Sequence, residues 1–325
     1  LDMSALVEAQ NKNVQALTAA NQAMFEGTKT LMQRQAEMAK QVFEEASEAL
    51  GLDLWRLVRE GPKPDLNRTE NTQPAMLAAG VAVWRVLREQ GAPEPGVMAG
   101  HSLGEYTALV CADALGFADA IALVAERGRL MQASVAPGAG AMAAILGLDD
   151  DQVRAVCAQA AQGEVVEAVN FNAPGQVVVA GRASAVQRAV AMAKDAGARR
   201  AVTLPVSVPS HCALMRPAAE RLAETLADVD LRPPTVPVLH NVTVAAAQDP
   251  ADIRDLLARQ LYSPVRWVET VQRMAQQGTT VLIEAGPGKV LAGLSKRIDN
   301  QLLSLAVYDA AGVEQVMEAL SDVER

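Results

Sequence analysis

Residues 138–206 alternate two kinds of pattern in an order that few folds accommodate. Strand-forming stretches occupy residues 140–148, 164–172, 175–182 and 199–206. Residues 149–162 and 183–197 instead repeat apolar residues with helical spacing, and residues 172–175 supply a hairpin loop. The order strand, helix, strand, strand, helix, strand predicts a split βαβ, ferredoxin-like unit. We therefore expect a small domain, residues 137–206, inserted into a larger one.

Helices and strands also alternate on either side of this unit. A helical run with Pro74 in its first turn leads through a Gly/Pro loop to a short strand that ends near Ala99. Further along, the pattern predicts a helix at 215–229, a strand pair or extended segment at 235–244, one or two helices at 251–278, and a final strand and turn at 280–288. We expect an α/β large domain from residues 41–136 and 207–325.

The composition is that of a globular protein without a nucleic-acid groove. Half of the 325 residues are hydrophobic, enough for a sizeable core, and the net charge of -9 argues against a surface that neutralises a nucleic-acid backbone. Cys111, Cys157 and Cys212 are odd in number and widely spaced, which favours reduced thiols over disulfides or zinc. No apolar stretch approaches the roughly 20 residues of a membrane span, and no signal-peptide pattern is present. These features predict a cytoplasmic protein.

The pattern predicts a separate helical segment at residues 1–40. Residues 4–40 contain no proline, and the apolar residues that continue beyond them fall on one helical stripe: Val7, Val14, Leu17, Met24, Leu31, Met38 and Val42. So thin a stripe requires a partner helix, a neighbouring domain or an amphiphilic surface. Packing against the rest of the same chain is the equally open alternative.

The run Gly100-His101-Ser102-Leu103-Gly104 fits the pattern G-x-S-x-G. In this pattern small residues flank the serine because side chains would obstruct a tight, strained strand-to-helix turn. An apolar strand precedes the run and the helix-forming stretch 105–115 follows it, so a helix N-terminus would also stabilise a developing oxyanion. Ser102 is therefore the predicted nucleophile.

A nucleophilic serine needs a base, and the chain contains three histidines. His101 directly precedes Ser102 and should point away from the hydroxyl, so we expect it to support or pack. His240 lies in an apolar extended segment that is typical of a core or edge histidine. His211 follows a loop at the end of a predicted strand, where catalytic residues of α/β sheets collect. We therefore predict that His211 is the general base.

Two arginines lie on an otherwise apolar helical run near residue 128. Arg127 and Arg129 are two residues apart and so occupy different faces. One of them can turn inward and hold a substrate carboxylate through a two-pronged contact. A solvated helix face is the alternative, and the residue pattern by itself does not choose between the two arginines.

Seven ordered motifs give a specific resemblance: "MAGHSLGEYTALVCADAL", "RGRLMQ", "GAGAMAAILGLDD", "VNFNAPGQVVVAG", "LPVSVPSHCALM", "RQLYSPVRW" and "EAGPGKVLAGLSKRI". Together they resemble the bacterial malonyl-CoA:acyl carrier protein transacylases, from about residue 41 to the C-terminus. The resemblance implies a hydrolase-like α/β large domain with a ferredoxin-like insertion. It also implies malonyl transfer for fatty-acid biosynthesis, with malonyl-CoA as donor, acyl carrier protein as partner and acceptor, and no cofactor or metal.

The resemblance also implies a role for individual residues. Ser102 is the acylated nucleophile, His211 the base and Arg127 the clamp on the malonyl carboxylate. Three further positions match supporting residues of the family: the Gln260 carbonyl steadies the histidine, Met131 lies in the wall of the acyl pocket, and the Leu103 N–H is one oxyanion donor.

The N-terminus departs from this resemblance. Members of the family begin with an apolar strand and a Gly-Gln-Gly loop whose glutamine is the second oxyanion donor, and this sequence has neither. Residues 1–40 instead resemble the helical N-terminus of phasins, which coat polyhydroxyalkanoate granules. We therefore expect reduced activity relative to an intact family member, and a helical partner or granule surface for this segment.

Two other functions remain open at this stage. The chain would be a granule- or partner-binding protein with a weak or inactive transacylase body if the N-terminal segment carried the function. It would be a serine thioesterase if water, and not a carrier thiol, took the acyl group. Granule binding and the ratio of free malonate to malonyl carrier protein separate these alternatives from malonyl transfer.

Overall fold

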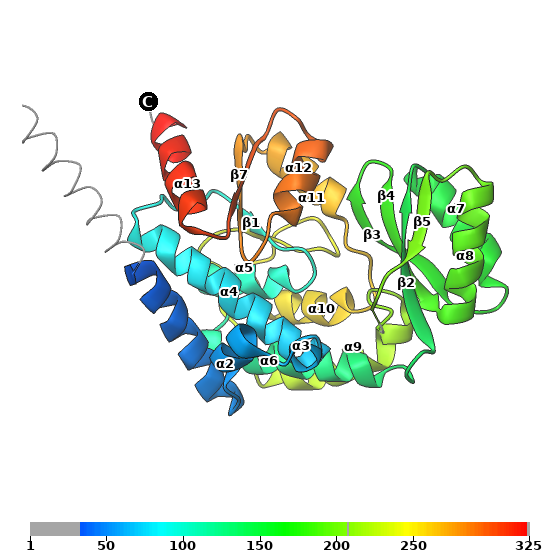
Figure 1. The fold of residues 1–325 in the computed structure, drawn as a ribbon, viewed down its shortest axis with the longest axis horizontal. Coiled ribbons are helices and arrows are strands. Elements are labelled where there is room, and N and C mark those ends of the chain that lie inside the picture. Colours follow the sequence, from blue (N-terminus) through cyan, green and yellow to red (C-terminus); the bar gives the residue numbers. More distant parts are fainter. Residues whose placement is uncertain (1–32, 207, 324–325) are drawn as a thin grey trace, which may run out of the picture.

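The computed structural model describes residues 33–206 and 208–323. A four-stranded antiparallel sheet with two helices lies at one end of the molecule, and a larger body of helices around short parallel strands forms the rest (Figure 1). Among the described residues, no helix combines the length and the hydropathy that a transmembrane span needs.

The antiparallel sheet has the strand order β3-β4-β2-β5. Its strands are β2 (Gly140–Leu146), β3 (Val166–Ala173), β4 (Gln176–Arg182) and β5 (Arg200–Thr203). Helices α7 (Asp150–Ala161) and α8 (Ala183–Asp195) pack on one face. The predicted order of strands and helices is confirmed. Alternating apolar residues give each strand one apolar face, which the helices cover.

Local signals set the ends of these elements. Asp149 caps α7: its side chain accepts a hydrogen bond from the Gln152 N–H, and the Gln152 Oε1 accepts one from the Asp149 N–H. The hairpin between β3 and β4 pairs Ala173 with Gln176, so its loop is shorter than the predicted 172–175. Gly175 in this loop has φ +69°, a conformation that glycine adopts without strain.

The larger body contains two parallel strand pairs. β1 (Met98–Ala99) pairs with β6 (Val238–Leu239), and β7 (Val281–Ala285) pairs with β8 (Leu303–Val307). Before the antiparallel sheet come a helix at residues 33–50, α2 (Leu54–Glu60), α3 (Lys63–Leu66), α4 (Thr69–Glu89), α5 (Gly104–Cys111) and α6 (Phe117–Ala133). After it come a 3-10 turn (Ala213–Met215), α9 (Arg216–Ala227), α10 (Pro250–Gln260), α11 (Trp267–Gln276), α12 (Val290–Ile298) and α13 (Ala310–Val323).

Three boundaries differ from the predicted pattern. α4 begins at Thr69, so Pro74 lies beyond its first turn and the prediction was wrong there. β7 is not the final strand, because β8 and α13 follow it. Of the extended segment 235–244, only Val238–Leu239 forms a strand. Tertiary packing therefore sets element ends that the local pattern leaves open.

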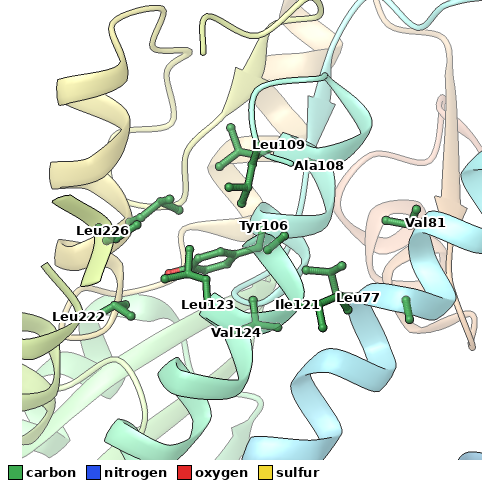
Figure 2. Packing of buried hydrophobic residues seen from close by; sticks show 14 of the residues in the cluster. Leu77, Val81, Tyr106, Ala108, Leu109, Ile121, Leu123, Val124, Leu222 and Leu226 are labelled. Atoms are coloured by element: carbon green, nitrogen blue, oxygen red, sulfur yellow. The ribbon is translucent and has the colours of Figure 1, made fainter. Parts of the chain in front are cut away.

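The main hydrophobic core lies among the helices of the larger body. Figure 2 shows α5 and α6 meeting α4 on one side and α9 on the other, through the buried side chains of Leu77, Tyr106, Ile121 and Leu222. At Gly128 of α6 an added Cβ would lie 2.6 Å from the backbone of α4. This close approach brings the residues next to Gly128 up against the first turns of α4.

The predicted phasin-like segment lies largely outside the described residues. Residues 1–32, which carry most of its apolar stripe, are not described, and residues 33–40 belong to the helix that continues to residue 50. On that helix Met38 packs against one hydrophobic cluster, and Val42 is fully buried in the main core. The end of the stripe thus packs against the rest of the chain.

Candidate active site

Ser102 lies at the sharp turn between β1 and α5. Its backbone has φ +52°, a left-handed conformation that is uncommon for serine. A Cβ at Gly100 would lie 1.8 Å from the carbonyl carbon of Gly104, so the turn requires glycine at position 100. A Cβ at Gly104 would meet no atom within 4 Å. The expectation that side chains would obstruct both flanking positions was therefore wrong for Gly104.

His211 approaches Ser102 from the segment that follows β5. Its Nε2 lies 2.8 Å from the Ser102 Oγ, and its Nδ1 lies 2.8 Å from the carbonyl oxygen of Gln260. A carbonyl only accepts, so Nδ1 carries the proton and Nε2 accepts from the hydroxyl. His211 also has a left-handed backbone, φ +65°, which its N–H stabilises by donating to the Leu261 carbonyl at 2.9 Å.

The surroundings of His211 keep its imidazole neutral. Burial, together with the positive charge of Arg127, lowers the pKa of His211 to about 3. A neutral imidazole with a free lone pair at Nε2 is the form that a general base requires. The pair can therefore activate the serine hydroxyl over the whole neutral range.

Arg127 is buried beside the same hydroxyl. Only 2 % of its surface is exposed. One Nη donates to Ser102 Oγ at 3.2 Å and to Gln260 Oε1 at 2.9 Å, and the other donates to Gln73 Oε1 at 2.7 Å. By contrast, Arg129 is exposed and pairs with Glu126 on the surface. The structure therefore places Arg127, and not Arg129, at the serine.

The charge of Arg127 has only neutral hydrogen-bond partners. Its contacts are amide oxygens and a hydroxyl, and no described carboxylate forms an ion pair with it. Burial lowers the pKa of Arg127, because the charged form loses its hydration. A buried cation that forms no direct ion pair favours an anion next to the nucleophile.

The other predicted site residues, Leu103, Met131 and His101, differ in their contacts. Within the described part of the chain, the Leu103 N–H takes part in no hydrogen bond, so it is available to an oxyanion beside Ser102. Met131 is buried, and its sulfur accepts from Gln73 Nε2 at 3.8 Å. His101 turns away from the serine and donates from Nε2 to Asn172 Oδ1 at 2.8 Å.

The site includes three buried polar residues that the residue patterns did not reveal: Gln73, Glu105 and Asn241. Gln73 comes from α4 and contacts Arg127, whereas Glu105 and Asn241 support the turn at Ser102. A signal existed for two of them, because a lone acid in an apolar helix and a lone amide in an apolar strand rarely stay unpaired in a core.

His240 lies next to this group as a core residue. It is fully buried and donates from Nδ1 to Glu105 Oε1 at 2.7 Å. Its Nε2 has no hydrogen-bond partner among the described residues. The expectation of a core histidine agrees with this burial, although only one of the two ring nitrogens is paired.

The chain resembles known proteins over most of its length. The family described as the acyl transferase domain matches residues 27–314. The malonyl CoA-acyl carrier protein transacylase of Haemophilus influenzae is 58% identical, with 86% of this chain and 90% of that protein covered. The protein of the same name from Escherichia coli K12 is 54% identical, over 86% of this chain and 91% of that protein.

Solved structures of similarly named enzymes also match most of this chain. A crystal structure of an acyl carrier protein S-malonyltransferase from Vibrio cholerae is 58% identical, covers 86% of this chain and 92% of that chain, and has a TM-score of 0.85. A malonyl-transacylase in complex with its type II PKS acyl-carrier protein is 53% identical, with 87% and 92% covered and a TM-score of 0.86.

Proposed function

The chain belongs to the acyl transferase domain family, and we propose that it transfers malonyl groups from malonyl-CoA to the phosphopantetheine thiol of an acyl carrier protein. The relatives described above carry this activity in their names, and one of them is bound to a carrier protein. One observation carries the proposal for this chain. The buried guanidinium of Arg127 lies 3.2 Å from the Ser102 hydroxyl, so the site pairs a nucleophile with a binding group for an anion.

In the first half-reaction Ser102 becomes acylated. His211 Nε2 takes the hydroxyl proton while the Ser102 Oγ attacks the thioester carbonyl carbon. The Leu103 N–H donates to the oxyanion of the tetrahedral intermediate. When the carbon–sulfur bond breaks, the proton on His211 goes to the departing sulfur, and coenzyme A leaves as a thiol.

The second half-reaction reverses these steps with a new thiol. The phosphopantetheine sulfur of the carrier protein gives its proton to His211 and attacks the malonyl ester on Ser102. The ester bond then breaks, and the Ser102 oxygen recovers its proton from His211. The hydrogen bond from His211 Nδ1 to the Gln260 carbonyl holds the ring in the same orientation for both steps.

Arg127 accounts for the preference for a malonyl group. The free carboxylate of a malonyl group supplies the direct ion-pair partner that the described residues around Arg127 do not. An acetyl group would leave the guanidinium buried and unpaired, which disfavours its transfer.

The N-terminal departure from the family supports a lower rate. We propose that the second oxyanion donor is missing, since the sequence contains no Gly-Gln-Gly loop. The loss of one such donor costs about 100- to 1,000-fold in turnover.

Residues 1–40 carry a further part of the proposal, an attachment function. We propose that the phasin-like segment attaches the enzyme to a helical partner or a granule surface, in the cytoplasm. Co-sedimentation with polyester granules that disappears when residues 1–32 are deleted would support this.

We also propose that residues 137–206 form a separate small domain within the large domain of residues 41–136 and 207–325.

Intact-protein mass spectrometry after brief incubation with malonyl-CoA tests the proposed reaction. We expect a malonyl adduct that is absent from the Ser102→Ala variant. Addition of holo acyl carrier protein should then move the adduct to the carrier, whereas a thioesterase would release free malonate instead. A folded protein that forms no adduct would overturn the proposal.

A further inference from the structure

Asn241 is the polar residue that encloses the Ser102 turn. Its side chain is buried, with 1 % of the residue exposed. Its Oδ1 accepts from the Ser102 N–H at 2.7 Å, and its Nδ2 donates to the Gly100 carbonyl at 2.7 Å. One amide group therefore binds the two backbone groups that flank His101, directly before the left-handed Ser102.

The two contacts hold the backbone next to Ser102, whose left-handed conformation is unfavourable. Left-handed φ is uncommon for serine, so without support the turn would relax toward a commoner conformation and move the hydroxyl. A primary amide can satisfy one N–H and one C=O at the same time, which a hydroxyl or an apolar side chain cannot do in this geometry. The chemistry of asparagine matches the two groups that the turn leaves free.

Glu105 holds Asn241 in place and connects it to the base. The fully buried carboxylate accepts from the Asn241 N–H at 2.8 Å and from Gln260 Nε2 at 2.9 Å. The Gln260 side chain in turn donates to the Ser102 carbonyl, and the Gln260 backbone carbonyl accepts from His211 Nδ1. The carboxylate thus links the supports of the nucleophile and of the base.

We propose that Asn241 is a positioning residue for the nucleophile, anchored by Glu105, and that it sets the acylation rate through the backbone of Ser102. It acts through Ser102 and has no contact with substrate in this assignment. The inference rests on the proposed function, because its effect is measured on acylation of Ser102.

The first test compares Asn241→Ala with Thr235→Val. Thr235 lies in the same segment, on the other side of β6, and its Oγ1 donates to the Ala112 carbonyl at 3.0 Å. The control therefore loses one tertiary hydrogen bond from side chain to backbone, where Asn241→Ala loses two. For Asn241→Ala we expect the malonyl-CoA acylation rate to fall about 10- to 100-fold, because a small displacement of a nucleophile is costly. KM should change less than about threefold, and the control should match the unchanged chain.

A second readout does not depend on coenzyme A. The rate at which a fluorophosphonate probe labels Ser102 reports the reactivity of the hydroxyl itself. We expect labelling to slow in Asn241→Ala to the same degree as acylation. If the unchanged chain is labelled but never malonylated, the proposed function fails. If both reactions proceed at unchanged rates in a folded Asn241→Ala variant, the positioning role fails.

The conservative variant Asn241→Asp separates positioning from stability. A protonated carboxyl group can accept from the Ser102 N–H and donate to the Gly100 carbonyl, whereas a carboxylate cannot donate. The charged and titratable groups around this position are Glu105 on α5, the adjacent His240, and Arg266, which donates to the Val242 carbonyl. Arg127 and His211 lie on the other side of Ser102, which both of them contact. Nearby Glu105 disfavours a second carboxylate, so the protonated form becomes populated as the pH falls.

We therefore expect the acylation rate of Asn241→Asp, relative to the unchanged chain, to rise about tenfold from about pH 8 to about pH 5.5. The rates are measured well below the melting temperature at each pH, so that all molecules are folded. This variant also decides the matter if Asn241→Ala does not fold. A ratio that stays constant with pH would overturn the proposal.

Discussion

The antiparallel sheet and the surroundings of Ser102 use β-structure in opposite ways. In the sheet, β2 and β4 pair over seven consecutive residues, and α7 and α8 bury one face. Beside Ser102, β1 and β6 pair over two residues each, and the neighbouring backbone is left-handed at Ser102 and His211. A long regular ladder stabilises the first region, whereas side-chain hydrogen bonds hold the second.

This difference separates stability from reactivity. A regular sheet buries apolar side chains and pairs its backbone groups, and both contribute to stability. The turn at Ser102 holds uncommon backbone conformations and a buried cation, which are unfavourable in the absence of substrate. We expect substitutions in the sheet to change the free energy of unfolding, and substitutions at the turn to change the reaction rate.

The largest effect is expected at the nucleophile. Ser102→Ala should lower the acylation rate by at least about 10,000-fold, because no other group can form the ester. The melting temperature should remain close to that of the unchanged chain, since a strained position loses only a hydroxyl. Quenched-flow mass spectrometry and calorimetry measure the two quantities. Residual acylation at a rate near that of the unchanged chain would mean that another residue is the nucleophile.

The sheet should give the opposite result. Ile145 is fully buried between β2 and the helices, so Ile145→Ala should lower the free energy of unfolding by about 2 to 5 kcal/mol. The rate per folded molecule should change less than about twofold. Val202→Ala on β5, where the residue is 38% exposed, is the matched control and should change stability little. Denaturant titration provides the free energies. A large loss of activity in folded Ile145→Ala would show that the two regions are coupled.

A smaller and more selective effect is expected at Arg127. Arg127→Ala should lower kcat/KM for malonyl-CoA by about 100-fold, because the charge-assisted hydrogen bonds to the malonyl carboxylate are lost. The exposed Arg129→Ala is the control and should keep its activity. Initial rates with malonyl-CoA and acetyl-CoA show the selectivity. Normal use of malonyl-CoA by Arg127→Ala would contradict the assignment of the clamp.

The smallest effect is expected on changing the pH. Because burial and Arg127 lower the pKa of His211 to about 3, its neutral form persists in the folded protein down to low pH. The acylation rate should therefore vary less than about threefold between about pH 8 and about pH 5. A decline centred near the ordinary histidine pKa of about 6.5 would show that His211 is not held neutral.

The same pKa has a consequence for stability. In the unfolded chain His211 has its ordinary pKa, so between about pH 6.5 and about pH 3 the unfolded state binds the proton first. The contribution of His211 to stability is therefore complete above this range and decreases as the pH falls through it. Chemical denaturation at several pH values measures this change.

The sequence by itself determined the order of the antiparallel unit and the tight turn at Ser102, the predicted nucleophile. Capping at Asp149 and alternating apolar residues are local, and so is the requirement for glycine at position 100 of the turn that presents Ser102. His211 was predicted from its place after a strand, out of three histidines. These features need only neighbouring residues for their physical explanation.

Only the tertiary structure decided how the site is completed. It selected Arg127 over Arg129, because the close contact at Gly128 brings Arg127 to Gln73 on α4. It also brought Glu105 and Asn241 together across 136 residues of sequence. A buried charge or amide finds its partners through the packing of distant segments, and no periodicity in the sequence records which segments meet.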